Sequence, residues 1–247
     1  MLDRKLVRFD GLSDCPRYTA EKLAAQLANL SPLSETHTLE CALNFLRGAK
    51  DPALRRSALG SRLSLHLAER NPDPDKREKL ASEGVRFAEA ALELGAEGDG
   101  QVHYYLATNL GLAVREHMAL AVENLARLES EMKRAVELSP DIDAGGPLRL
   151  LGMLYLKAPP WPTGIGDGDK ALELLKQAVE THPNHPLNHL FYAQALWDVE
   201  ESAAAVQVKQ EMTTGMRLLR EGNWGYNKAP WNKEFADFQN QIEDFGL

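Results

Sequence analysis

The chain has few cysteines and no long apolar run. Only two of its 247 residues are cysteine, Cys15 and Cys41, and they form no Cys-x-x-Cys motif. Two isolated cysteines exclude a disulfide framework, and we expect both to be reduced thiols, with Cys41 in a core. No apolar stretch approaches the roughly 18–20 residues that a transmembrane helix requires, so the sequence predicts no membrane insertion.

The chain also lacks a run of basic residues. Lys and Arg number 28 against 36 Asp and Glu, which leaves a net charge of −8, and neither nucleic acid nor an anionic membrane is an expected partner. With 44% hydrophobic and 26% charged residues, the composition is that of an ordinary globular protein. The first 18 residues contain no apolar signal core, which predicts a cytoplasmic protein; removal of a native leader would make it periplasmic instead.

Motifs of the common catalytic classes are missing as well. The sequence contains no Gly-x-Ser-x-Gly, Walker or His-Glu-x-x-His motif. Each of these motifs supplies the nucleophile, phosphate cradle or metal ligands that its chemistry requires. We therefore expect a protein that is not an enzyme and that needs no cofactor.

Three histidines form the clearest metal candidate. His182, His185 and His189 are spaced His-x2-His-x3-His, and zinc prefers a tetrahedral set that is often completed by Cys or a carboxylate. However, Pro183 and Pro186 place the three residues across a turn between two helices, and no nearby Cys completes the set. We predict that these histidines cap or pack helices and bind no metal.

A glycine-rich segment, Gly164-x-Gly-x-Gly168, has the composition of a phosphate or calcium loop. It lacks the preceding strand and the Lys-Ser/Thr pair of a phosphate loop, and the terminal Glu of a calcium loop. We predict instead that Asp169 caps a helix beginning at Lys170, because a carboxylate there faces the positive end of the helix dipole.

The segment 148–183 carries the strongest structural signal. Leu151-Gly152 stands between Leu148 and Tyr155, and the second half of the segment repeats small and large residues in the order Ala171, Leu175, Ala178, Pro183. This pattern resembles the tetratricopeptide repeat, in which two antiparallel helices pack through such faces. Gly152 and Ala171 are expected to let the helix backbones approach, while the large residues fill the space around the contact.

The same pattern can be followed through three more regions. HYYLATNL (103–110) and HLFYAQAL (189–196) share His, Ala and Leu in one register, which indicates equivalent helices. The matching positions are Gly60, Glu83 and Phe87 in the first unit, Ala107, Leu128 and Met132 in the second, and Ala193, Ala205, Lys209 and Met212 in the last.

Three of the four units carry extra residues at the turn inside the hairpin. The extra segments are 68–80, expected to be a solvated loop, 114–130, expected to be an amphipathic helix, and 157–169, which holds Trp161 between prolines. Equivalent insertions in a solenoid project from one edge, which is often where binding occurs. We therefore expect the three segments to lie on one edge and to cover a groove or pocket.

Both ends of the chain predict capping helices. Ala20–Leu30 and Glu35–Arg47 are amphipathic, and apolar residues recur at helical spacing near the C-terminus at Trp231, Phe235, Phe238, Ile242 and Phe245. The predicted fold is all-α: a tetratricopeptide-like antiparallel helical-hairpin solenoid forming one domain over 1–247. Its N-terminal caps occupy about 1–50, four degenerate repeats occupy 51–222, and a C-terminal cap occupies 223–247.

A narrower resemblance covers about residues 100–200. Gly145-Gly146-Pro147, the insertion Ala158-Pro-Pro-Trp-Pro162 and Asn188-His-Leu190 resemble the T component of tripartite ATP-independent periplasmic (TRAP) transporters. The resemblance implies degenerate tetratricopeptide-like helices around an apolar channel or pocket, a solute-binding protein as partner, and export as a lipoprotein.

Two hypotheses for function follow. One is a non-enzymatic scaffold that binds a protein partner, such as a solute-binding protein, and the other is a carrier that encloses an apolar small molecule; the oligomeric state stays open. Aromatic side chains offer apolar area with few rotors and polar tips that orient a ligand. We place the site where the loop around Trp161 meets the first helices of the central repeats. The Trp161 side chain either lines the site or staples the loop to the helices. The site residues are Tyr104, Tyr105, Asn109, Tyr155, Trp161 and His189.

Overall fold

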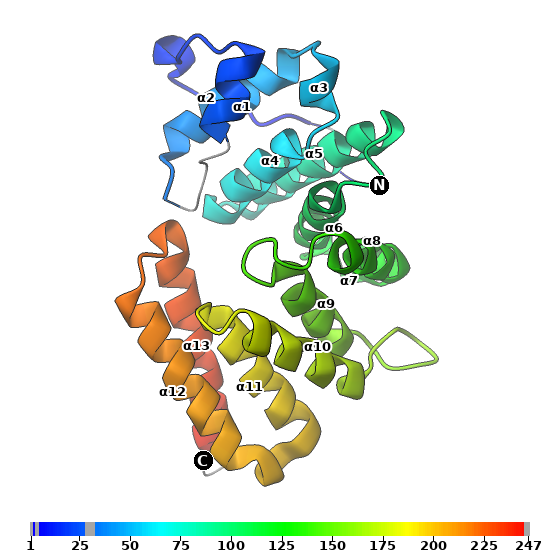
Figure 1. Ribbon diagram of the computed structural model, residues 1–247, viewed down its shortest axis with the longest axis vertical. Helices are drawn as coiled ribbons and strands as arrows, with labels where there is room; N and C mark the ends of the chain where they lie inside the picture. Colours follow the sequence, from blue (N-terminus) through cyan, green and yellow to red (C-terminus); the bar gives the residue numbers. More distant parts are fainter. Residues whose placement is uncertain (1, 3–4, 28–32, 245–247) are drawn as a thin grey trace. The chain divides into compact units, whose positions relative to one another are not determined.

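Every regular element in the described part of the protein is helical. The computed structural model describes residues 2, 5–27 and 33–244 (Figure 1), and in them the one strand-like feature is an isolated bridge between Pro160 and Gly166. None of the described helices combines the length and the apolar character needed to cross a bilayer. The all-α prediction is confirmed.

The chain divides into two compact units, Met1–Ser139 and Pro140–Leu247. Whether they act as one repeat domain stays a prediction. In the first unit, α1 (Ala20–Leu27) and α2 (Thr36–Gly48) occupy the region where capping helices are expected; residues 28–30 of the first predicted helix lie outside the described part. The further helices are α3 (Pro52–Arg55), α4 (Leu59–Arg70), α5 (Pro74–Glu93), α6 (Gly100–Val114), α7 (Met118–Glu123) and α8 (Leu125–Leu138).

Long helices of the first unit pack on their neighbours in the chain. Helix α2 contacts α4, α4 contacts α5, α5 contacts α6, and α6 contacts α8, while α4 also reaches α6. Local sequence sets where several of these helices begin. Asp51, Asp73 and Asp99 accept hydrogen bonds of 2.8, 3.0 and 2.9 Å from backbone N–H groups of the turn that follows each of them, which satisfies donors that the helix itself leaves unpaired.

The structure overturns the solvated loop predicted over 68–80. Helix α4 runs to Arg70 and α5 begins at Pro74, so only residues 71–73 separate them. Proline at the first helical position loses no hydrogen bond and presets the helical φ angle, so it starts this helix instead of breaking it. Segment 114–130 is helical as predicted, mainly in α7 and the start of α8. That the three segments share one edge stays a prediction, because 68–80 and 114–130 belong to the first unit and 157–169 belongs to the second.

The described part of the second unit, residues 140–244, contains five long helices in chain order. They are α9 (Gly146–Lys157), α10 (Gly168–Thr181), α11 (Pro186–Glu200), α12 (Ala205–Glu221) and α13 (Lys228–Asp244), with the short helices η2 (Glu201–Ala204) and η3 (Gly225–Asn227) between the last three. Each long helix contacts the next, α9 also contacts α11, and α11 also contacts α13. The unit therefore has the same neighbour-to-neighbour packing as the first.

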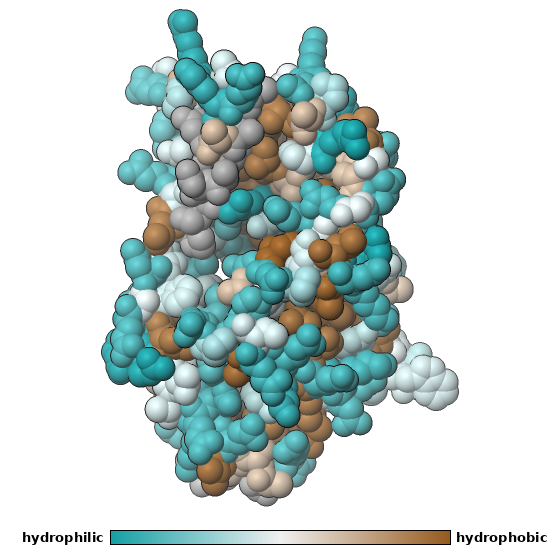
Figure 2. Space-filling view, in the orientation of Figure 1, coloured by the Kyte–Doolittle hydropathy of each residue, from teal (hydrophilic) through white to brown (hydrophobic). Residues whose placement is uncertain are grey.

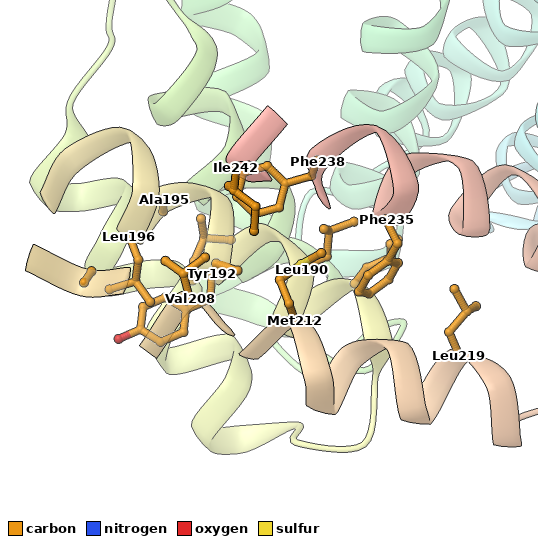
Figure 3. Packing of buried hydrophobic residues seen from close by; sticks show 14 residues of the cluster. Leu190, Tyr192, Ala195, Leu196, Val208, Met212, Leu219, Phe235, Phe238 and Ile242 are labelled. Atoms are coloured by element: carbon orange, nitrogen blue, oxygen red, sulfur yellow. The ribbon is translucent and has the colours of Figure 1, made fainter. Parts of the chain in front are cut away.

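Helices α11, α12 and α13 enclose a common apolar core (Figure 3). Phe235, Phe238 and Ile242 of α13 are buried against residues of α11 and α12 such as Leu190 and Met212. The helix predicted near the C-terminus is therefore present as α13, and its capping role stays a prediction; the last predicted residue, Phe245, lies outside the described part.

Two glycines make the helix contacts that the sequence predicted for the first and third of the proposed repeats. A Cβ on Gly152 of α9 would lie 2.6 Å from the Cγ of Leu175 on α10, and a Cβ on Gly60 of α4 would overlap the ring of Phe87 on α5. These are the predicted partner positions, and only glycine permits so close an approach. Glu83, at the position expected to be small, forms an ion pair of 2.7 Å with Arg47 of α2.

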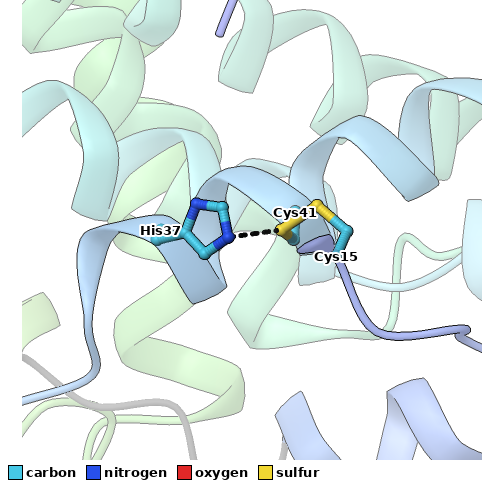
Figure 4. The surroundings of a disulfide bond; sticks show 3 residues. All are labelled: Cys15, His37 and Cys41. Carbon is cyan, nitrogen blue, oxygen red and sulfur yellow. Dashed lines mark hydrogen bonds between the residues drawn. A yellow bond between two sulfur atoms is a disulfide. The ribbon is translucent and has the colours of Figure 1, made fainter. Parts of the chain in front are cut away.

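The prediction of reduced cysteines is wrong in this structure. Cys15 and Cys41 form a disulfide whose Cα atoms are 5.5 Å apart (Figure 4). Cys41 is 2% exposed on α2 and thus lies in a core, as predicted, while Cys15 directly follows the short helix η1 (Leu12–Asp14). The bond joins the N-terminal segment to the second capping helix.

Candidate functional site

The site residues predicted in the first unit are packed within its helices. Tyr104, Tyr105 and Asn109 on α6 are all buried. The amide nitrogen of Asn109 donates to the carbonyl oxygen of Ser61 at 2.9 Å and to that of Tyr105 at 2.7 Å. Gly84 on α5 leaves room for this amide, because a Cβ there would overlap it. Asn109 therefore ties α6 to α4.

His189 of the second unit repeats an arrangement found in the first. Its Nδ1 lies 2.6 Å from Glu211, and its Nε2 lies 2.7 Å from the carbonyl oxygen of the sixth residue before it. His103 makes the corresponding contacts, at 2.6 Å to Glu131 and at 2.9 Å to the carbonyl oxygen of the sixth residue before it. In each unit the imidazole joins the preceding turn to a following helix, which agrees with the packing role predicted from their shared register.

These contacts change the pKa of His189. Burial by itself lowers the pKa of His189, but the hydrogen bonds to the Glu211 carboxylate and to the Pro183 carbonyl oxygen outweigh it, and the pKa is raised. An imidazole whose two nitrogens both already have partners is a poor metal ligand, because metal binding requires a free nitrogen lone pair.

The histidine pairs correct the register of the last repeat. Since Glu211 corresponds to Glu131, Val208 corresponds to Leu128. Val208 is fully buried on α12, whereas Lys209, the predicted packing position, is exposed. The apolar face of α12 therefore differs from the one predicted, because the turn before it includes the η2 helix that the spacing did not reveal.

Tyr155 anchors the base of the Trp161 loop, which we define as residues 158–167. The ring of Tyr155 is buried on α9, and its carbonyl oxygen accepts a 3.0 Å hydrogen bond from the backbone N–H of Asp167 at the far end of the loop. Asp167 also caps α10 by accepting a 3.1 Å hydrogen bond from the N–H of Lys170. The cap predicted at Asp169 is therefore wrong by two residues.

The Trp161 loop is closed by its own backbone and projects from the helices (Figure 1). The N–H of Gly166 donates to the carbonyl oxygen of Pro159 at 2.8 Å, and that of Gly164 donates to Pro160 at 3.2 Å. A Cβ on either glycine would overlap the backbone of the opposite side, so both positions require glycine. Trp161, which precedes a cis proline, is 84% exposed. It does not staple the loop to the helices.

Sequence reasoning missed a buried polar cluster at the start of α9. Arg149, 3% exposed, donates to the side-chain oxygen of Asn188 at 2.7 Å and to the carboxylate of Asp143 at 2.9 Å. Asn188 in turn donates to the carbonyl oxygens of Ala144 at 3.1 Å and of His182 at 2.9 Å. Asp143, Ala144 and Gly145 have φ angles of 51°, 49° and 83°, and the cluster holds this unusual turn. The only signal was the Gly-Gly-Pro sequence.

The three histidines considered for metal binding do not converge on one point. His182 pairs with Asp141 at 3.0 Å, and His189 pairs with Glu211. His185 lies 3.4 Å from the guanidinium of Arg149, and burial together with that charge lowers the pKa of His185 to about 2. A guanidinium beside the imidazole also opposes the binding of a cation.

The first unit contains a pocket of about 390 Å³ that the sequence did not indicate. It lies between the N-terminal segment, α2, α4 and α5, and most of its lining is polar or charged. The lining residues include Arg8, Asp10, Thr36, Glu40, Arg70, Asn71 and Lys76. A lining with this many charges does not suit the apolar ligand of the carrier hypothesis.

Of the six predicted site residues, five are buried in their own units and Trp161 alone is exposed. Figure 2 shows hydrophobic residues among hydrophilic ones on one face of the protein, and Trp161 has the largest exposed fraction of the large hydrophobic side chains described. The candidate functional element is therefore the Trp161 loop. No protein-family model matches the chain, and no curated protein matches it either.

Proposed function

We propose that this protein is a non-enzymatic scaffold of tetratricopeptide-like hairpins that binds a protein partner through the Trp161 loop. Helices that pack on their neighbours in order, the glycine contacts at Gly60 and Gly152, and the paired His103 and His189 support the repeat architecture. Such hairpins present extended surfaces for binding.

The exposed Trp161 carries this proposal. An indole that is 84% exposed leaves a large apolar area in water, and a protein partner would remove that area from water. The loop is already closed by hydrogen bonds, so little conformational freedom would be lost on binding. Rigid aromatic side chains of this kind are the usual anchors of protein interfaces.

The polar groups of the second unit favour a binding role over chemistry. Arg149, Asn188 and His189 direct their nitrogen and oxygen atoms to neighbouring helices and turns. They stabilise the hairpins and are not offered to a substrate. The apolar carrier remains a second hypothesis, which the polar pocket of the first unit does not support.

The partner we propose is the solute-binding protein of a TRAP-type transport system. The basis is the resemblance of the Gly145-Gly146-Pro147 turn, the Trp161 loop and the Asn188-His189-Leu190 helix start to the T component of such systems. The Cys15–Cys41 disulfide favours an oxidising compartment, which supports a location in the periplasm, where a solute-binding protein works.

Isothermal titration calorimetry with a solute-binding protein encoded beside this chain tests the proposal. We expect a complex, and we expect Trp161→Ala to weaken it at least about tenfold, the effect of truncating an anchor residue. Val206→Ala is the matched control, because Val206 is also exposed, at 72%, on the same unit. An unchanged affinity in Trp161→Ala would remove the loop from the interface, and the absence of any complex would contradict the partner.

A further inference from the structure

The disulfide of the first unit has a third potential metal ligand beside it. The Nε2 atom of His37 lies 3.5 Å from the Sγ of Cys41 (Figure 4). The ligand atoms of Cys15, His37 and Cys41 all lie within 4.8 Å of one another. A disulfide needs no such neighbour, since its two sulfurs satisfy each other.

These distances fit tetrahedral zinc. With Zn–S bonds of about 2.3 Å and Zn–N bonds of about 2.0–2.1 Å, a tetrahedral site separates a nitrogen from a sulfur ligand by about 3.6 Å. The observed 3.5 Å between His37 and Cys41 already has this value. The two sulfurs need to move to about 3.8 Å apart, which rotation of the cysteine side chains provides once the bond between them is broken.

Secondary structure holds two of the three ligands in place. His37 and Cys41 are four residues apart on α2 and therefore lie on one face of the helix, the spacing by which helices present metal-ligand pairs. Cys15 approaches from the C-terminal end of η1. His37 is exposed and Cys41 is buried, so an ion can enter from the solvent side and a water molecule can occupy the fourth position.

We infer that Cys15, His37 and Cys41 form a zinc site when the disulfide is reduced. A dithiol reductant transfers two electrons and two protons to the disulfide, which yields two thiols while the reductant becomes a disulfide. Zinc then replaces both thiol protons and takes the lone pair of the imidazole nitrogen. The site does not depend on the Trp161 loop. The redox state of the compartment selects between the two forms: the oxidising compartment proposed above keeps the disulfide, and a reducing one allows the metal-bound form.

Cobalt(II) is the spectroscopic probe for this site, since it binds where zinc does and absorbs when it has thiolate ligands. The full chain is reduced without oxygen by a phosphine, which takes up an oxygen atom from water and becomes a phosphine oxide. We expect one cobalt per chain, a thiolate-to-cobalt charge-transfer band and the strong visible bands of tetrahedral cobalt. Added zinc should remove the charge-transfer band and the visible bands. The oxidised chain should show none of them.

Variants separate this site from simple binding to two thiols. We expect His37→Ala to weaken cobalt binding at least about tenfold and Cys15→Ser to abolish the charge-transfer band. His117→Ala should leave binding unchanged; His117 is also exposed and also in the first unit, where it pairs with Glu78 at 3.0 Å. Circular dichroism checks that each variant is folded, and His37→Gln is used in place of His37→Ala if that variant does not fold.

Two results overturn the inference. One is a reduced wild-type chain without the charge-transfer band, which shows that the thiols do not hold the metal. The other is a folded His37→Ala variant, or its His37→Gln replacement, that binds cobalt as tightly as the wild type, which shows that the imidazole is not a ligand.

Discussion

The exposure of Trp161 makes a quantitative prediction about stability. A fully buried Trp removes up to about 250 Å² from water, and a Trp that is 84% exposed removes only about a sixth of that. At about 25 cal/mol per Å², the contacts of Trp161 contribute at most about 1 kcal/mol to the free energy of unfolding. Trp161→Ala should therefore leave the second unit nearly as stable as the wild type.

Trp224 is the matched comparison within the same unit. Its indole N–H donates to the carbonyl oxygen of Leu218 at 3.1 Å, and its ring centroid lies 5.4 Å from that of His185 and 5.5 Å from that of Trp231. Truncating a buried aromatic residue costs about 3–5 kcal/mol. Because Trp224 is half-buried, we expect Trp224→Ala to lower the free energy of unfolding by about 2–4 kcal/mol.

Urea unfolding followed by tryptophan fluorescence measures both variants. All four tryptophans of the chain, at positions 161, 197, 224 and 231, belong to the second unit, so their emission reports on that unit. Removing the exposed Trp161 should also shift the average emission of the folded protein to shorter wavelength. A loss of about 3 kcal/mol in Trp161→Ala would refute the reasoning, because it would mean that the ring packs as a staple.

Three further predictions concern packing, polar satisfaction and pH. Asn188→Ala should lower the free energy of unfolding by about 3–5 kcal/mol, because the substitution removes the acceptor of a buried guanidinium and a donor to buried carbonyl oxygens. Asn232→Ala, at an exposed site, should change the free energy of unfolding by less than about 0.5 kcal/mol. Equal losses of the two variants in urea unfolding would contradict this prediction. Gly152→Ala should cost about 1–3 kcal/mol because its Cβ would lie 2.6 Å from a leucine on α10, whereas Gly48→Ala, with open space around it, should show no loss in thermal unfolding. Burial, aided by two nearby arginines, lowers the pKa of His66 from 6.5 to about 3, so as the pH falls the unfolded chain binds a proton at His66 before the folded chain does. Between pH 7 and 5 the free energy of unfolding should therefore fall by about 2 kcal/mol more in the wild type than in His66→Asn. Equal falls in the two proteins would show that His66 is not kept neutral.

Sequence alone determined the helical class and much of the packing. Gly60 and Gly152 could be recognised as close-approach positions because a small residue at fixed helical spacing has few other uses. His103 and His189 could be matched by register, and their equivalent hydrogen bonds agree with that match. The C-terminal helix was equally readable, since Phe235, Phe238 and Ile242 repeat at helical spacing, and all three are buried.

Local sequence was less informative where one residue type serves two purposes. Proline within 68–80 indicated a loop, yet Pro74 stands at the first position of α5, where its missing N–H costs nothing. The sequence predicted that Asp169 caps α10, and only the backbone path shows that Asp167 accepts the hydrogen bond. Such alternatives differ by a few tenths of a kcal/mol to about 1 kcal/mol locally, so tertiary context decides between them.

Only the tertiary structure decided what is exposed and what meets across the chain. Nothing local distinguishes the buried Tyr155 from the exposed Trp161, because burial depends on which helices cover a residue. The pairing of Cys15 with Cys41, 26 residues apart, and the approach of His37 to them arise from the way the N-terminal segment folds back on α2. Helical periodicity reports the face of one helix, whereas a site is made of faces from several helices, and their meeting is set by packing of the whole unit.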